Sequence, residues 1–495
     1  MITINPALLN ADGTPDAALL LAILQRHRGE RERLDELLRI YNREHPIASR
    51  VRLKGLPNNR LAHDLPGYIV TMAAGYLIGR PVVYTPSEDT RKEFEPISQA
   101  LAAACADSVD MELAADASIF GRGVEVCYAD GKSRPRIAQM DVRTSFVVYD
   151  DTVEHNPLLG ISLRDLYDRN FQRSGEHVTV YTASEIVGYE RVGEEAPAEK
   201  GRKPHYFGGV PIIEYWNNSR EQGDFEPVID LINAYDVLQS DRMNDKQQFT
   251  DSILALYGVG ALGLDDTEEY AQNPGTGEIE ELPPERKEKL TPSQRLRQTK
   301  TLFMPNGDTK AEFLTKPMSE ADTEVLRESL KNDIHKLCLV PDMTDEEFAG
   351  NVSGVAMRFK LLGLEQLTRI KERWFREGLR SRLRLFANFL KRKGAPAVDT
   401  DAVQISFTRS LPANELEIAQ TVATYQGMVP QQLLLGQVPF VEDAEEAMVM
   451  LEQEQNAAVE RQQKAFAAQD FREHQGEEQK SGKGEASEQE RRPEG

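Results

Sequence analysis

The sequence predicts an α+β protein in which one antiparallel β-section is set between helical segments. Residues 17–120 and most of residues 319–471 carry apolar side chains at helical spacing. Residues 124–216 instead alternate between apolar and polar side chains, and Gly, Asp and Pro turns separate the short alternating runs. Helices and antiparallel strands that occupy separate stretches of a chain are typical of the α+β class.

Length and charge limit the functions that the chain can have. At 495 residues it is long enough for several domains. Its net charge of −22 argues against a surface that grips DNA, because tight phosphate binding needs clustered cations, but it does not exclude a protein that surrounds DNA without holding it. The apolar runs are too short to span a membrane, and the N-terminus lacks the pattern of a signal peptide, so no membrane association is expected.

The first part of the chain predicts helices followed by strands. Residues 17–42 form a charged amphipathic pattern, and residues 60–78 form a second helical pattern that the following Gly-Arg-Pro should end. A short strand is expected at 81–85, and residues 88–120 are predicted to be largely helical. The candidate strands of the β-section are 124–129, 136–140, 145–150, 158–163, 176–182, 185–192 and 210–216.

The middle of the chain predicts a helix pair. Helical patterns cover residues 224–256 and 319–339, and between them residues 257–317 are rich in turns and contain a predicted hairpin at 302–314. Two helices that flank a small insertion are expected to lie antiparallel, with the insertion as a compact module at their tip.

A long basic helix is expected next, after an acidic loop at 341–354 that contains glycines. Residues 355–393 have no proline and carry a net charge of +9, which leaves −31 for the rest of the chain. Gly363 and Gly378 are positions where this helix could bend. Such a helix could be an assembly element that meets acidic neighbours, or its cations could form a solvated face, and the pattern does not decide between the two.

The C-terminal part is predicted to contain a short strand at 402–408 and helices at 414–425 and 441–471. From residue 475 onward the chain has no aromatic residue and should be disordered.

One glycine motif could indicate an enzyme. Gly258–Gly263 matches GxGxxG, but dinucleotide binding needs a strand before the motif and a helix after it, and a helix is predicted before it here. Glycines that end a helix explain the motif better. The sequence also contains no HExxH and no GxSxG motif. We therefore expect no catalytic site, no metal site and no cofactor.

Several stretches together resemble the portal (connector) proteins of tailed phages, of the type found in siphophages of Gram-positive bacteria. The most specific is Phe348-Ala-Gly-Asn-Val-Ser-Gly-Val-Ala-Met-Arg-Phe-Lys-Leu361, which is similar to the family's tunnel loop and the start of its long wing helix. Residues 58–81 resemble the N-terminal wing helix, and residues 231–241 resemble the first stem helix. The likeness extends over roughly residues 40–455 and includes Ser410–Asn414 and Val438–Val441, which fit the run into the crown.

The resemblance implies a portal fold: a wing of helices with an antiparallel β-section, a two-helix stem, a small α/β clip, a long wing helix after a tunnel loop, and a helical crown. The implied boundaries are 1–225 for the N-terminal part of the wing, 226–256 and 318–340 for the stem helices, 257–317 for the clip and its connecting hairpin, 341–354 for the tunnel loop, 355–400 for the long wing helix, 401–471 for the crown and 472–495 for a disordered acidic tail.

The resemblance also implies a function that is not enzymatic. Portal proteins form a ring, here expected to have twelve subunits, at one capsid vertex. Double-stranded DNA passes through the ring without sequence-specific binding when the terminase motor packages it and when it is ejected. The implied partners are the terminase large subunit, a head-completion adaptor, tail proteins, and the major capsid and scaffolding proteins. The protein would be assembled in the host cytoplasm and reside in the virion. The alternatives are a nucleotide-binding enzyme that uses residues 258–263 and a cytosolic oligomeric scaffold.

Candidate site residues follow from the same resemblance. The tunnel loop, expected to line the DNA channel, comprises Thr344, Asp345, Glu346, Glu347, Phe348, Gly350, Asn351, Ser353 and Gly354. Lys331 and Lys336 are candidate channel cations. The clip residues expected to meet the motor are Glu268, Glu269, Glu280, Glu281, Arg286 and Lys287.

Overall fold

The structure, a computed structural model, contains helices and mostly antiparallel sheets, which confirms the α+β class. It describes residues 1–249 apart from 54, 55 and 194, then residues 320–343, 354–409 and 415–436, and parts of 438–461. Between 250 and 319 it describes strands alone, namely β11 (Ile253–Tyr257), β12 (Tyr270–Gln272), β13 (Ile279–Glu281), β14 (Thr301–Met304) and β15 (Lys310–Leu314).

The largest sheet has six strands in the order β1-β5-β6-β7-β8-β9, and only its β1–β5 pairing is parallel. Its strands are β1 (Ile2–Ile4), β5 (Ser145–Asp150), β6 (Pro157–Tyr167), β7 (Arg173–Tyr181), β8 (Glu185–Arg191) and β9 (Ala198–Pro204). The N-terminal half of α1 (Ala17–Tyr41) packs on one face of this sheet through Leu20, Ile23 and Leu24. The two edge strands were not predicted. Every residue of β9 is exposed, so its sequence lacks the apolar alternation that identifies a strand.

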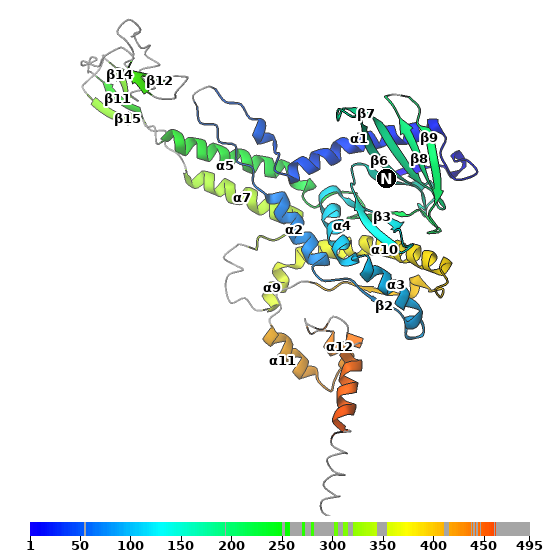
Figure 1. Cartoon of the computed structure of the whole chain (residues 1–495). Helices are drawn as coiled ribbons and strands as arrows, with labels where there is room; N and C mark the ends of the chain where they lie inside the picture. Colours follow the sequence, from blue (N-terminus) through cyan, green and yellow to red (C-terminus); the bar gives the residue numbers. More distant parts are fainter. Residues whose placement is uncertain are drawn as a thin grey trace, which may run out of the picture.

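A second sheet, in the order β10-β3-β4, lies between the helices of the body. Its strands are β3 (Arg122–Ala129), β4 (Pro135–Met140) and β10 (Ile212–Trp216). The long helix α10 (Leu362–Arg392) packs against β10, and α4 (Ala106–Phe120) packs against β3. Figure 1 shows α10 and α4 next to this sheet in the middle of the body.

The structure corrects the bounds of two predicted helices and shows that the segment correctly predicted to be largely helical, 88–120, consists of two helices. The helix expected at 355–393 is divided at Leu361 into α9 (Gly354–Lys360) and α10. The helix expected from residue 60 begins only with α2 (Leu65–Ile78), because the Asp64 side chain caps it by accepting a hydrogen bond from the Gly67 N–H. The segment 88–120 is divided into α3 (Arg91–Ala103) and α4 by Cys105, whose φ of 54° cannot continue a helix.

A two-helix arm projects from the body and consists of α5 (Ile229–Phe249) and α7 (Glu320–Cys338), which lie side by side (Figure 1). Strands β11, β12, β14 and β15 lie at its end, as expected for a compact module between two helices. The helix predicted through residue 256 is wrong, because α5 ends at Phe249 and β11 begins at Ile253. The hairpin predicted at 302–314 is wrong in its pairing, because β11 lies between β14 and β15 and pairs with both.

The C-terminal part begins with β16 (Gln404–Ser406), which pairs with β2 (Val83–Thr85). Helices α11 (Glu415–Tyr425) and α12 (Gln431–Leu435) follow, and residues 447–459 are helical. Among the described residues, no helix combines the length and the apolar character that crossing a membrane requires.

Candidate functional site

The base of the arm is held by an extended segment that runs along α5. Backbone N–H groups of Asn59, Leu61 and His63 donate hydrogen bonds of 2.7, 3.0 and 2.9 Å to side-chain oxygens on α5. The acceptors are Asn244, Ser240 and Asp236, all fully buried. Two residues of an extended chain advance about 6.7 Å, and four residues of a helix advance about 6 Å. Every second N–H group of the extended segment therefore lies opposite every fourth residue of α5. We call residues 58–64 the strap.

Sequence reasoning missed this anchor. The signal that could have revealed it is the recurrence of small polar side chains at every fourth position, 236, 240 and 244, which places them on one face of the helix. Buried polar groups of this kind need partners, and backbone N–H groups outside regular structure need acceptors.

Two histidines meet one carboxylate at the C-terminal end of the strap. The carboxylate of Asp236 accepts hydrogen bonds from His45 Nδ1 and, at 2.8 Å, from His63 Nδ1. The hydrogen bond with Asp236 outweighs burial and raises the pKa of His45. Burial opposes the charge of Asp236, but the two histidine side chains outweigh it and lower its pKa. The group is therefore a charged anchor that joins α5 to the strap through His63 and to the segment before the strap through His45.

The second helix of the arm, α7, leads back to the body and into the predicted tunnel loop. The Tyr68 hydroxyl on α2 donates a 2.8 Å hydrogen bond to the Pro341 carbonyl and accepts one of 2.8 Å from the Met343 N–H. Lys331, a predicted channel cation, forms a 2.6 Å ion pair with Asp342 in the same segment. The structure thus fixes residues 341–343 to both α2 and α7.

The structure describes only some of the remaining predicted site residues. Lys336 is exposed in the last turn of α7, Gly354 is the first residue of α9, and Glu280 and Glu281 lie in β13, which pairs with β12. Outside the described residues are Thr344, Asp345, Glu346, Glu347, Phe348, Gly350, Asn351, Ser353, Glu268, Glu269, Arg286 and Lys287.

The long basic helix α10 buries one of its arginines completely. The Arg382 guanidinium lies 2.6 Å from Asp110 on α4 and 3.0 Å from Glu125 on β3. Tyr215 donates a 2.6 Å hydrogen bond to Glu125, and its ring lies beneath the guanidinium. Burial opposes the charge of Arg382, but Asp110 and Glu125 raise its pKa well above the ordinary value. Arg382 therefore remains a cation and joins α10 to α4 and β3.

Lys371, about three helical turns before Arg382 on the same face, is the second buried cation of α10. Its ammonium forms an ion pair with the buried Asp224, which also accepts hydrogen bonds from Ser118 and Asn217. The positive charge of α10 is thus divided: Lys371 and Arg382 are neutralised inside the chain, whereas Arg373, Lys391 and Arg392 are exposed.

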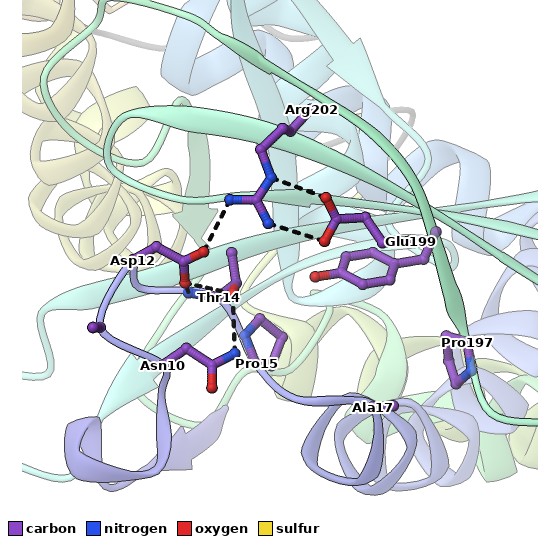
Figure 2. Close-up of a pocket in the computed structure, with 10 residues that line it drawn as sticks. Asn10, Asp12, Thr14, Pro15, Ala17, Pro197, Glu199 and Arg202 are labelled. Carbon is purple, nitrogen blue, oxygen red and sulfur yellow. Dashed lines mark hydrogen bonds and ion pairs between the residues drawn. The ribbon is translucent and has the colours of Figure 1, made fainter.

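A surface pocket of about 570 Å³ lies between the N-terminal loop and strand β9 (Figure 2). Its charged groups neutralise one another, because Arg202 forms 2.9 Å ion pairs with both Asp12 and Glu199. Hydrogen bonds from Thr14 and Arg202 lower the pKa of Asp12 to about 2. The pocket is a closed ion-pair network and presents no free cation for a phosphate group.

The glycine motif at 258–263 can be compared with a dinucleotide site only through the strand before it. A strand, β11, ends directly before the glycine motif at 258–263, where a helix was expected, so one of the two requirements of a dinucleotide site is present. The motif itself and the residues that follow it up to 269 lie outside the described residues. Among the described residues, no group of three or more His, Cys, Asp or Glu side chains could hold a metal ion.

Comparison with known proteins gives consistent matches. The family model described as "Phage portal protein, SPP1 Gp6-like" matches residues 20–461. The portal protein of Bacillus phage SPP1 is 24% identical over 425 residues, which cover 82% of this chain and 78% of that protein. The portal protein of Clostridium phage phiCD119 is 28% identical over 246 residues, which cover 49% of this chain and 48% of that protein.

Proposed function

Because this chain belongs to the SPP1 Gp6-like family of phage portal proteins, we propose that it forms a ring-shaped channel at one vertex of a phage capsid. Double-stranded DNA would enter through this channel during packaging and leave through it during ejection. The ring would contain twelve subunits. The terminase large subunit would dock on it during packaging, a head-completion adaptor and tail proteins would bind afterwards, and the major capsid and scaffolding proteins would surround it.

The observation that supports this proposal best is the two-helix arm. Helices α5 and α7 project from a large body and carry a small β-module at their end (Figure 1). We assign α5 and α7 to the stem and the strands between them, β11 to β15, to the clip, so that the predicted boundary at 256 moves to the end of α5. Residues 1–225 and 355–400 would form the wing, and residues 401–471 the crown.

The anchoring of the arm suits a channel wall. A stem that surrounds moving DNA must keep its angle to the body, and the strap holds α5 through three buried acceptors. Arg242 on α5 and Glu324 on α7 form a 2.8 Å ion pair that links the two helices. These contacts support the assignment of a rigid stem.

The charge of the chain suits passage rather than binding of DNA. Each cation that neutralises a phosphate adds salt-dependent affinity, which would slow a translocating duplex. Lys331 is paired with Asp342, so Lys336 is the candidate channel cation whose ammonium is exposed. We propose that residues 344–354, with Glu346 and Glu347, line the narrowest part of the channel and repel the duplex.

Negative-stain electron microscopy of the purified protein tests the ring directly. End-on views should show closed rings of about twelve subunits around a hole wide enough for duplex DNA. Monomers or dimers at every protein concentration and salt concentration would contradict the proposal. Binding of a dinucleotide or a nucleoside triphosphate by such a monomer would instead favour the enzyme alternative.

A further inference from the structure

The exposed face of α10 is basic and partly apolar. Arg373 is exposed, Arg380 is half-buried, and neither forms an ion pair with any other part of the chain that the structure describes. The Nε of Arg380 is buried without a hydrogen-bond partner. On the same side of the helix, Ile370 and Trp374 are 46% and 37% exposed. Cations next to apolar side chains favour a protein partner over a nucleic-acid backbone, which offers phosphates but little apolar surface.

The exposed face of α4 is acidic and also carries an apolar residue. Asp107 and Glu112 are exposed, with the 36%-exposed Met111 between them, and Asp116 lies one turn further along. Asp116 accepts a 2.6 Å hydrogen bond from Gln139, but no cation of the described chain pairs with it. Burial raises the pKa of Asp116 to about 7, and Asp141 and Glu112 add to this effect. A guanidinium from outside the chain would stabilise this carboxylate.

These two faces point in opposite directions. The side chains of Arg382 on α10 and Asp110 on α4 point at each other across the buried interior. At 100° per residue, Arg373 and Arg380 lie on the side of α10 roughly opposite Arg382, and Glu112 and Asp116 lie on the side of α4 away from Asp110. Asp107 and Met111 lie at the edge of that acidic face, about 60° and about 100° around the helix from Asp110. One outer face of the body is therefore basic, and the other is acidic.

Two different, complementary and opposed surfaces are what a head-to-tail interface in a closed ring requires. We propose that the outer face of α10 in one copy binds the outer face of α4 in the next copy, so that Arg373 and Arg380 of one copy meet Asp107, Glu112 and Asp116 of its neighbour. Ile370 and Trp374 would pack near Met111 in the centre of the contact. This inference rests on the proposed ring, and it adds which surfaces close that ring.

Charge reversal on each side, followed by mixing, tests the proposal. The first variant carries Arg373→Glu and Arg380→Glu, and the second carries Asp107→Arg and Glu112→Arg. Each variant alone places like charges opposite one another at every junction, so ring formation should weaken by at least about tenfold. In an equal mixture the reversed α10 of the first variant meets the reversed α4 of the second, and the two unchanged faces meet each other. The mixture should therefore restore rings, and these rings should contain an even number of alternating subunits.

The controls separate folding, assembly and the identity of the interface. Circular dichroism should show that both variants are folded, and Arg26→Glu with Arg28→Glu, two exposed cations on α1, should form rings like the wild type. If a reversed variant does not fold, the neutral variants Arg373→Gln/Arg380→Gln and Asp107→Asn/Glu112→Asn replace it. These neutral variants should need about tenfold more protein to form rings.

The possible failures differ from one another. Wild-type protein that never forms rings would overturn the proposed function and this interface together. If either reversed variant formed rings as readily as the wild type, the proposed interface would be wrong, but the proposed ring would stand. Folded variants that form no rings singly and none when mixed would also reject this pairing of faces. Loss of DNA binding by the first variant, with its rings intact, would assign the α10 face to nucleic acid instead.

Discussion

Tyr68 and Met343 are joined by a 2.8 Å hydrogen bond from the Met343 backbone N–H to the Tyr68 hydroxyl, which itself donates to the Pro341 carbonyl. One side chain on α2 thus holds both sides of Asp342, directly before the proposed tunnel loop. Tyr68→Phe keeps the ring but leaves both backbone groups without this partner, which should cost about 1–3 kcal/mol locally. Hydrogen–deuterium exchange should show faster exchange at Met343.

Tyr128→Phe is the matched control for this prediction. Tyr128 is 43% exposed and its hydroxyl has no hydrogen bond with the described residues, so its removal should leave exchange at Met343 unchanged. Equal exchange at Met343 in the wild type and in Tyr68→Phe would show that the hydroxyl does not hold this segment.

Replacement of Arg382 should be among the most destabilising changes in the body. Arg382→Met leaves the buried carboxyls of Asp110 and Glu125 without their cation, and such a loss costs about 3–5 kcal/mol. Burial already raises the pKa of both carboxyls, and removal of the guanidinium raises it further. An acid whose pKa is higher in the folded than in the unfolded chain binds protons on folding, and this favours the folded state at low pH. The loss of unfolding free energy in Arg382→Met should therefore be smaller at pH 5 than at pH 8.

Urea unfolding of Arg382→Met and the wild type at several pH values measures this effect. Arg384→Met is the matched control, because Arg384 and its partner Asp401 are both more than half exposed, and its loss should cost less than about 1 kcal/mol. Equal costs for the two variants, or a cost for Arg382→Met that does not change with pH, would contradict the prediction.

The anchor at Asp236 should weaken as the pH rises. The raised pKa of His45 gives stabilisation that is complete below the unfolded value of about 6.5 and is lost as the pH passes the folded pKa. The lowered pKa of Asp236 gives stabilisation that is present above the unfolded value of about 3.9 and is lost only as the pH falls through the folded pKa. The strap should therefore be held best between about pH 4 and 6.5.

Amide exchange of residues 58–64, corrected for the intrinsic pH dependence, measures this anchor. Protection should fall above about pH 6.5 in the wild type, and Asp236→Asn should lower protection by about tenfold and remove the pH trend. Asp230→Asn, an exposed change in the first turn of the same helix, is the control. An unchanged pH trend in Asp236→Asn would assign the effect to other groups.

The sequence was sufficient to predict the helical arm and most strands of the body. Strands such as β7 and β8 bury alternate side chains on a sheet, and this burial is visible as a period of two in the sequence. Strand β9 was missed because it is an exposed, charged edge, where hydrogen bonding to β8 rather than burial maintains the strand. The pairing of β14 and β15 with β11 was missed because strand order depends on contacts between distant residues, which local patterns do not contain.

The sequence identified the candidate site only in part. The net charge of α10 indicated an unusual helix, but the same composition is compatible with buried and exposed cations. Burial of Lys371 and Arg382 depends on Asp224, Asp110 and Glu125, which lie more than 100 positions away in the chain. Their convergence could not be predicted from periodicity. The resemblance to portal proteins was carried by longer stretches of sequence and did not depend on these pairs.

Charge reversal in the proposed tunnel loop should slow DNA packaging. Glu346→Lys with Glu347→Lys replaces repulsion of the duplex by contacts to its phosphates in every subunit, and we expect packaging to slow by about threefold or more. Packaging assays with capsids and terminase at low and high salt measure the rate, and high salt should reduce the defect. Glu154→Lys with Glu195→Lys, in exposed turns of the six-stranded sheet, is the control. Unchanged rates in the loop variant would reject the proposed role of the loop.

The two glycines of α10 should respond in opposite ways to alanine. A Cβ on Gly378 would lie 2.4 Å from the Tyr215 ring, which is fully buried and cannot move away, so Gly378→Ala should destabilise by about 1–3 kcal/mol. A Cβ on Gly363 would meet no atom closer than the Leu339 carbonyl oxygen at 3.4 Å, so Gly363→Ala should gain up to about 1 kcal/mol from helix propensity.

Thermal and urea unfolding of both variants provides the comparison, with each serving as the control for the other. Gly378 lies in the interior of α10, which continues through it, so this glycine is not a bend; Gly363 is the second residue of α10, two positions after the break at Leu361. Gly378 is required for close packing of the helix on strand β10, and Gly363 is not. Stabilisation by Gly378→Ala, or equal destabilisation by both changes, would show that flexibility rather than packing explains the glycine at position 378.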